Sequence, residues 1–261
     1  MKLFYAHKTI LTGIDICFIV NYYSAVKIVF LNTWDCTNKD NVKEFIEKHS
    51  QDTDVFCLQE AYEKTKWLCR DILLNYNMVA DCKYLSDTDY FPQATYLKKD
   101  TNILFSETLL LNTPGTGLAL YTHIQINDRD VHICNVHGVS EPGDKLDNVG
   151  RLRQSQEIIE RFRSLEGIKI IGGDFNLELN TKSLKMFEES SYRNLISEYK
   201  VLTTRNKFVW ERFPESKQYF SDYVFVNRGL KVKEFSVPDV EVSDHLPMIL
   251  VVDLDPSISQ V

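Results

Sequence analysis

Apolar residues follow two alternating patterns along the chain: short runs rich in β-branched and aromatic residues, and longer stretches with helical spacing. The short runs are bounded by Gly, Asn, Asp and Pro, which is typical of strands separated by turns. They predict strands at residues 26–32, 54–59, 77–84, 102–106, 117–126, 130–137, 168–173, 221–226, 230–237 and 246–254.

The longer stretches predict amphipathic helices, because their apolar residues recur on one face at helical period. In residues 39–49 this face contains Val42, Phe45 and Ile46. Several strands follow one another directly, with no helix between them. This mixture favours two sheets packed face to face with helices outside over strict alternation of strands and helices. The other helices are predicted at residues 62–75, 151–165 and 181–190.

Length and composition favour one globular domain. The chain has 261 residues, of which 44% are hydrophobic and 26% charged, and its net charge is −7. This acidic balance argues against a protein that coats nucleic acid through a broad basic surface, although one cleft can still bind phosphate locally. We expect the domain at residues 26–256, after an N-terminal extension at residues 1–25.

The extension and the cysteines bear on the location of the protein. Residues 1–25 begin with basic and apolar residues, as a signal peptide does, but Asp15 interrupts the apolar stretch. A signal would make the protein secreted or membrane-anchored, and we favour a plain extension. The six cysteines form no C-x-x-C pair, and Cys57 and Cys134 lie within apolar runs. We therefore expect reduced core thiols, a cytoplasmic location, no zinc site and no transmembrane segment.

Polar residues able to do chemistry occur at the ends of the predicted strands. Antiparallel neighbours bring the end of one strand and the start of the next to the same edge of a sheet. Each residue alone is typical of a turn, but their joint occurrence predicts one polar rim. The rim residues are Asn32, Glu60, His137, Asp174, Asn176, Asp222, Asp244 and His245.

Short motifs around these residues resemble the endonuclease/exonuclease/phosphatase superfamily. They are FLNTW at 30–34, LQE at 58–60, NVHG at 135–138, GDFN at 173–176, SDYVFV at 221–226 and SDHLPM at 243–248. The resemblance implies an α/β fold, a four-layer α/β/β/α sandwich of two packed mixed β-sheets flanked by helices. It also implies metal-dependent hydrolysis of phosphate esters, as in abasic-site endonucleases, deoxyribonucleases and neutral sphingomyelinases.

The resemblance implies a divalent-metal site made of oxygen ligands. Glu60 would be the main ligand, Asn32 would contact the metal or the phosphate, and Asp244 would support the site. Mg²⁺ is the expected ion and Mn²⁺ the alternative, because such cations prefer oxygen ligands and promote attack on phosphate esters. Asp35, three residues beyond Asn32, is expected to face solvent.

The resemblance also assigns catalytic roles. Asp174 would orient and deprotonate the attacking water, and Asn176 would donate its amide to a phosphate oxygen. His245 would stabilise the charged transition state, and Asp222 would hold its ring in the required tautomer and orientation. His137 would contact the phosphate or the leaving oxygen.

Two segments beside the rim bear on the substrate. Residues 138–153 contain Lys145 and Arg151, which either bind a substrate phosphate or belong to a surface loop and a solvated helix start. Residues 206–220 contain aromatic residues that either stack on a base or pack against a sheet.

The favoured function is a metal-dependent phosphodiesterase or phosphomonoesterase whose substrate is open: a nucleic acid, a small molecule or a lipid headgroup. A structure-specific DNA or RNA endonuclease is the alternative, and the net charge of −7 weakens it. A non-catalytic binding module on the same fold is a further alternative. The presence of Glu60, Asp174 and His245 argues against that module, because such descendants usually lose a metal or base residue.

Overall fold

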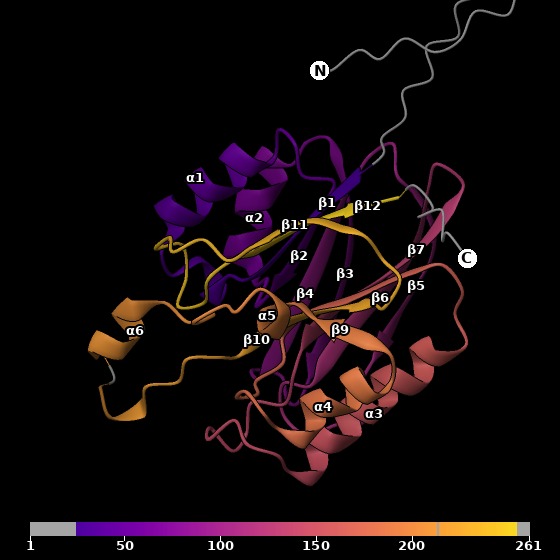
Figure 1. Cartoon of the computed structure of the whole chain (residues 1–261). Coiled ribbons are helices and arrows are strands. Elements are labelled where there is room, and N and C mark those ends of the chain that lie inside the picture. The colour runs from indigo at the N-terminus through magenta and orange to yellow at the C-terminus, as the bar shows by residue number, and fades with distance from the viewer. Residues whose placement is uncertain (1–24, 213, 255–261) are drawn as a thin grey trace, which may run out of the picture.

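The computed structural model describes residues 25–212 and 214–254 (Figure 1). Residues 1–24 of the expected extension lie outside the described residues, as do the last two residues of the expected domain, whereas Ala25 already belongs to the first strand. Within the described ranges, no helix combines the length and the apolar composition that a bilayer crossing requires.

Two mixed sheets of six strands each form the centre of the fold. The first has the strand order β11-β12-β1-β2-β4-β3, and only its β1–β2 pair is parallel. That pair aligns Asn32 with Gln59, so both strands end at the same edge. The strands are β1 (Ala25–Asn32), β2 (Val55–Gln59), β3 (Tyr76–Tyr84), β4 (Tyr90–Lys98), β11 (Val232–Ser236) and β12 (Met248–Asp253).

The second sheet repeats this arrangement. Its strand order is β5-β6-β7-β8-β10-β9, and only the β7–β8 pair is parallel. That pair aligns His137 with Asp174 at the ends of the two strands. The strands are β5 (Asn102–Leu109), β6 (Leu118–Ile126), β7 (Arg129–His137), β8 (Ile168–Asp174), β9 (Tyr192–Asn194) and β10 (Asp222–Asn227).

Helices cover the outer face of each sheet and complete the four layers expected from the sequence (Figure 1). They are α1 (Lys39–His49), α2 (Glu63–Ile72), α3 (Val149–Arg163), α4 (Lys182–Glu189) and the short α5 (Leu195–Glu198). A sixth helix, α6 (Lys207–Arg212), projects away from the sheets (Figure 1). On the first sheet, Val42 and Ile46 of α1 share a buried cluster with Phe56 of β2. On the second, Phe187 of α4 stacks on Phe225 of β10, with ring centroids 4.5 Å apart.

Two glycines of β8 allow the sheets to approach each other near the rim. A Cβ at Gly172 would lie 2.8 Å from the ring of Phe30 in β1, so only glycine leaves room for that ring. Gly173 has a φ of +130°, which side chains rarely tolerate, and a Cβ there would lie 2.3 Å from Val136 O. The two glycines therefore let β8 carry Asp174 to the edge where β1 ends.

A buried polar contact links the two sheets at the same edge. Gln59 Nε2 donates to Asn135 Oδ1 at 2.6 Å, and Asn135 Nδ2 donates to the carbonyls of Leu58 and Ala94 at 3.3 and 3.2 Å. Such buried hydrogen bonds favour one alignment of the two sheets, because a buried polar group left without its partner destabilises the fold. Glu60 follows Gln59 directly, so this contact also fixes where Glu60 leaves the first sheet.

Candidate active site

The two parallel strand pairs end at one edge and bring the predicted rim residues together. Asn32, at the end of β1, donates from Nδ2 to Glu60 Oε1 and to Asp174 Oδ2, both at 3.1 Å. Because Asp174 ends β8 in the other sheet, this single amide joins the two sheets at the site. The remaining rim residues lie around these three and are connected to them by contacts: His137, Asn176, Asp222, Asp244 and His245.

Glu60 is the most accessible carboxylate of the rim, with 27% of its side chain exposed. Its φ of +51° is a left-handed conformation that costs a non-glycine residue about 1–3 kcal/mol. Thr33 Oγ1 holds this turn by hydrogen bonds to the carbonyls of Gln59 and Glu60 at 3.1 and 3.0 Å. Strain of this kind persists where the surrounding structure imposes it, and here it directs an accessible carboxylate into the site.

Asp174 occupies the centre of the site and is only 2% exposed. Its Oδ1 accepts hydrogen bonds from Ser221 Oγ at 2.5 Å and from Asn176 N at 2.9 Å. Its Oδ2 accepts from Asn32 and lies 3.6 Å from His245 Nε2. One oxygen is thus fixed by the protein, and the other faces the groups that would surround a substrate.

The surroundings of Asp174 keep it ionised although it is buried. Burial opposes ionisation, but nearby positive charge, that of His245 first and Lys145 next, lowers the pKa of Asp174 well below its ordinary value. Lys145 acts through a serine: its Nζ donates to Ser221 Oγ at 2.6 Å and to Asn176 Oδ1 at 3.1 Å. Desolvation lowers the pKa of Lys145, which is itself buried.

His245 is oriented by a carboxylate as the sequence suggested. Its Nδ1 lies 2.9 Å from both oxygens of Asp222, so the proton on Nδ1 points to Asp222 and Nε2 faces Asp174. Burial and Arg205 oppose protonation of the ring, but the carboxylates of Asp222, Asp244 and Asp174 raise the pKa of His245 above its ordinary value.

His137 lies between one carboxylate from each side of the site, Glu60 and Asp174. It is buried at the end of β7, and its Nε2 lies 3.9 Å from Glu60 Oε1 and from Asp174 Oδ2. The ring of Phe91 packs edge-on beside it, with centroids 6.3 Å apart. Its Nδ1 is buried with no hydrogen-bond partner among the described residues. His137 therefore presents Nε2 to the space between the two carboxylates.

Arg151 does not lie in the site, in contrast to the expectation from the sequence. Its side chain is fully buried and holds the loop at residues 138–148 in shape. The guanidinium nitrogens have no free direction toward a substrate, because the loop uses them. They donate to the carbonyls of Val139, Ser140, Pro142 and Leu146 and to the carboxylate of Asp144.

Arg205 is a site residue that the sequence did not reveal. Its Nη2 donates to Asp244 Oδ2 at 2.8 Å, and its Nη1 contacts His245 Nε2. Asp244 also accepts a hydrogen bond from Ser243 Oγ at 3.1 Å. Arg205 belongs to none of the motifs, and backbone pairing with His245 brings it to the site.

The oxygen donors of the rim fit a hard divalent cation. Glu60 supplies an accessible carboxylate beside the Asn32 amide, and these are ligand types that Mg²⁺ and Mn²⁺ take. Asp174, Asp222 and His245 also have ligand atoms within 4.8 Å of one another. Both oxygens of Asp222 lie against His245 Nδ1, however, so that group is better explained as an oriented base and imidazole.

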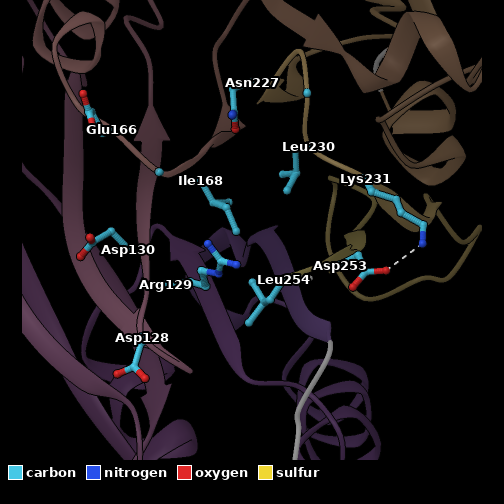
Figure 2. A pocket seen from close by; sticks show the side chains of 12 residues that line it. Asp128, Arg129, Asp130, Glu166, Ile168, Asn227, Leu230, Lys231, Asp253 and Leu254 are labelled. Carbon is cyan, nitrogen blue, oxygen red and sulfur yellow. Dashed lines mark hydrogen bonds and ion pairs between the residues drawn. The ribbon is translucent and has the colours of Figure 1, made fainter. Parts of the chain in front are cut away.

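A second cavity lies at the opposite ends of the strands, near the start of β8 and the end of β12 (Figure 2). Its charged residues include Arg129 and the ion pair between Lys231 and Asp253, whose Nζ and Oδ2 are 2.9 Å apart. Acidic and basic side chains are mixed there, and its lining includes no histidine. This lining differs from the rim, where carboxylates, amides and imidazoles converge.

The comparison with known families agrees with the geometry of the rim. A model described as the Endonuclease/Exonuclease/phosphatase family matches residues 31–245, a range that contains every rim residue. The chain belongs to this family. Its members are typically hydrolases of phosphoester bonds, so a phosphoesterase or nuclease activity is supported. No curated protein matches this chain in sequence.

Solved structures share the fold at low sequence identity. A D. rerio TDP2, humanized by 14 mutations, has a TM-score of 0.71 at 15% identity, covering 88% of this chain and 99% of that chain. An endonuclease/exonuclease/phosphatase from Bacteroides vulgatus has a TM-score of 0.70 at 18% identity, with coverages of 88% and 99%. The human nocturnin catalytic domain with a bound sulfate anion has a TM-score of 0.71 at 15% identity, with coverages of 89% and 95%. At such identities the likeness shows the fold.

Proposed function

We propose that this chain is a divalent-metal-dependent phosphoesterase that cleaves a phosphodiester or phosphomonoester bond by attack of an activated water. The observation that carries this proposal is the environment of Asp174. Ser221 and Asn176 fix one oxygen of this ionised carboxylate, and the other oxygen faces Asn32 and His245. A general base must be held in this way, within hydrogen-bond reach of the water that it activates.

The metal in this proposal is Mg²⁺, with Mn²⁺ as the alternative, and Glu60 would hold it. A bound divalent cation supplies positive charge that polarises the phosphoryl group. Asn32 keeps the Glu60 carboxylate in place, and His137 contacts the phosphate from between Glu60 and Asp174. Asp244 supports the site indirectly, because its carboxylate is bound to Arg205.

In the reaction, Asp174 Oδ2 orients the water and accepts its proton while the water oxygen forms a bond to phosphorus. The bond from phosphorus to the leaving oxygen breaks, and that oxygen keeps the electron pair and takes a proton from solvent. With both ring nitrogens protonated, His245 donates from Nε2 to a phosphate oxygen, and Asp222 holds the ring in that orientation. Asn176 Nδ2 donates one hydrogen to the carbonyl oxygen of Gly138, at 3.1 Å, and directs its other hydrogen to the phosphate.

A structure-specific nuclease remains the second candidate. A D. rerio TDP2 complexed with a single-strand DNA product has the same fold, with a TM-score of 0.70 at 14% identity. The net charge of −7 favours a small ester, or one bound locally, over an extended nucleic acid. We place the enzyme in the cytoplasm, because all five described cysteines are free thiols and four of them are buried. We assign the activity to one catalytic domain at residues 26–256.

The test is hydrolysis of a panel of phosphate esters with and without Mg²⁺ or Mn²⁺. The panel contains plasmid DNA, an abasic-site duplex, single-stranded RNA, sphingomyelin, inositol phosphates and bis-(p-nitrophenyl) phosphate. We expect metal-dependent release of product from at least one ester, and loss of that activity in Glu60→Gln. Activity that survives chelation of divalent metal, or folded protein inert on the whole panel, would contradict the proposal.

A further inference from the structure

The segment that carries Arg205 is bound to the segment that carries the catalytic imidazole of His245. Leu246 N donates to Thr204 O at 2.8 Å, and Arg205 pairs with His245 in an antiparallel bridge. Residues directly opposite each other in such a pair have their side chains on the same face. Thr204 Oγ1 also accepts from Asp222 N at 3.1 Å. Arg205 and His245 therefore enter the site side by side from a backbone that is fixed on both sides.

The guanidinium of Arg205 contacts His245 as well as its counterion Asp244. An arginine that only neutralises a carboxylate commonly forms two parallel hydrogen bonds with it. Arg205 instead gives Asp244 one nitrogen, Nη2 at 2.8 Å, and turns Nη1 to His245 Nε2. That ring nitrogen is the one that faces Asp174, with 3.6 Å between Nε2 and Oδ2. The side chain is 11% exposed, so its charge is only partly screened by water.

We propose that Arg205 is a catalytic residue that donates from Nη1 to a non-bridging oxygen of the substrate's phosphate. This assignment rests on the proposed phosphoesterase function and adds a positive charge on the His245 side of Asp174. Asp244 acts as the positioning carboxylate that fixes the guanidinium before the substrate arrives. A planar guanidinium matches the geometry of phosphate oxygens, and a donor fixed in advance stabilises the charge that develops on them.

The experiment measures two properties of Arg205→Met, Arg205→Gln and Arg205→Lys: hydrolysis of the best ester of the panel, and binding of inorganic phosphate by calorimetry with Mg²⁺ present. We expect kcat to fall about 100-fold in the methionine and glutamine variants, as for the loss of one fixed donor to a transition state. Inorganic phosphate should bind about 10-fold more weakly. Lysine should restore little, because it lacks the planar fork.

Two controls separate this role from structural ones. Lys207→Met removes an exposed cation two residues away and should leave both properties unchanged. The Mg²⁺ affinity of the folded Arg205 variants should match that of the wild type. If Arg205 only held Asp244 at a metal site, its loss would change the Mg²⁺ affinity. Wild-type phosphate affinity in Arg205→Gln overturns the assignment. If the wild type hydrolyses no ester, the proposed function fails, and the phosphate titration alone still decides the role of Arg205.

Discussion

The two parallel strand pairs each bring a carboxylate to the same edge, partly exposed in the first sheet and buried in the second. In the first sheet, β1 ends in the neutral amide of Asn32, and the carboxylate of Glu60 directly follows β2; the Glu60 side chain is 27% exposed. In the second sheet, β7 and β8 end in His137 and Asp174, whose side chains are each 3% exposed. The two strand pairs have the same topology, but the carboxylate of Glu60 is partly exposed and that of Asp174 is buried.

This difference separates two chemical tasks. A carboxylate that is open to solvent can exchange water for a metal ion, because the ion must reach it and shed part of its hydration. A buried carboxylate held by Ser221 and Asn176 cannot rearrange in that way, and it suits the fixed geometry that a base requires. The comparison predicts that changes on the second sheet's side alter the rate of reaction and that changes at Glu60 alter metal affinity.

The largest effect is expected from Asp174→Asn. The substitution preserves shape and removes the proton acceptor, so kcat should fall about 1,000-fold. Steady-state hydrolysis of the best ester at saturating Mg²⁺ measures this loss. The matched control is Asp87→Asn in an exposed turn, which should keep wild-type activity. An Asp174→Asn protein with a rate within threefold of wild type would remove Asp174 from the mechanism.

Lys145→Met should reduce kcat about 10- to 100-fold while KM changes less than about threefold, because misplacing a reacting group slows chemistry more than binding. The physical reason is the chain of contacts from Lys145 Nζ to Ser221 Oγ and from Ser221 Oγ to Asp174 Oδ1, at 2.6 and 2.5 Å. Separate determination of kcat and KM is the measurement. A rise in KM at unchanged kcat would instead support the direct substrate contact expected from the sequence.

Asp222→Asn should move the alkaline limb of the pH–rate profile to lower pH and reduce the rate about 10-fold near neutrality. The pKa of His245 is raised by Asp222, Asp244 and Asp174, against burial and Arg205. If the protonated ring is the active form, activity is present below this raised pKa and is lost as pH rises through it. Without Asp222 the pKa falls, so the loss begins earlier. An alkaline limb that does not move would show that another group controls it.

The smallest effect is expected from Asp35→Asn, on the first sheet's side of the rim. Asp35 forms an exposed ion pair with Lys64, with 3.0 Å between Nζ and Oδ2 and 31% of the Asp35 side chain exposed. Exposed pairs contribute about 0–1 kcal/mol, and this one is outside the contacts of Glu60. Hydrolysis rate and Mg²⁺ affinity should both stay within about twofold of wild type. A tenfold loss of Mg²⁺ affinity would extend the metal site to Asp35.

Much of the fold could be predicted because the spacing of apolar residues within a single segment already distinguishes a helix from a strand. The helix predicted at residues 39–49 is α1, and the strands predicted at 117–126 and 130–137 are β6 and β7, joined by a hairpin turn with Asn127 and Asp128 at positive φ. β4 was missed because Pro92 and polar residues break its pattern, yet it is an interior strand. β9 was missed because it has only three residues.

The rim residues could be found from the sequence because they lie in short motifs at strand ends. The supporting contacts could not be found, because they join residues far apart in the chain. Ser221 meets Lys145 and Arg205 meets Asp244 only after the loops have packed. Arg151 is the opposite case: the sequence suggested a role that the structure does not show. Its position near the rim suggested that it binds a phosphate, but its hydrogen bonds go to loop carbonyls. Charge near a site does not determine the direction of a side chain.

The most direct test of the central claim is a calorimetric Mg²⁺ titration of Glu60→Gln and Asp174→Asn beside the wild type. The account predicts that Glu60→Gln loses measurable Mg²⁺ binding, while Asp174→Asn retains an affinity within about threefold of wild type. The reverse result, with binding retained in Glu60→Gln and lost in Asp174→Asn, would place the metal at the cluster of Asp174, Asp222 and His245. It would contradict the division of tasks between the two sheets.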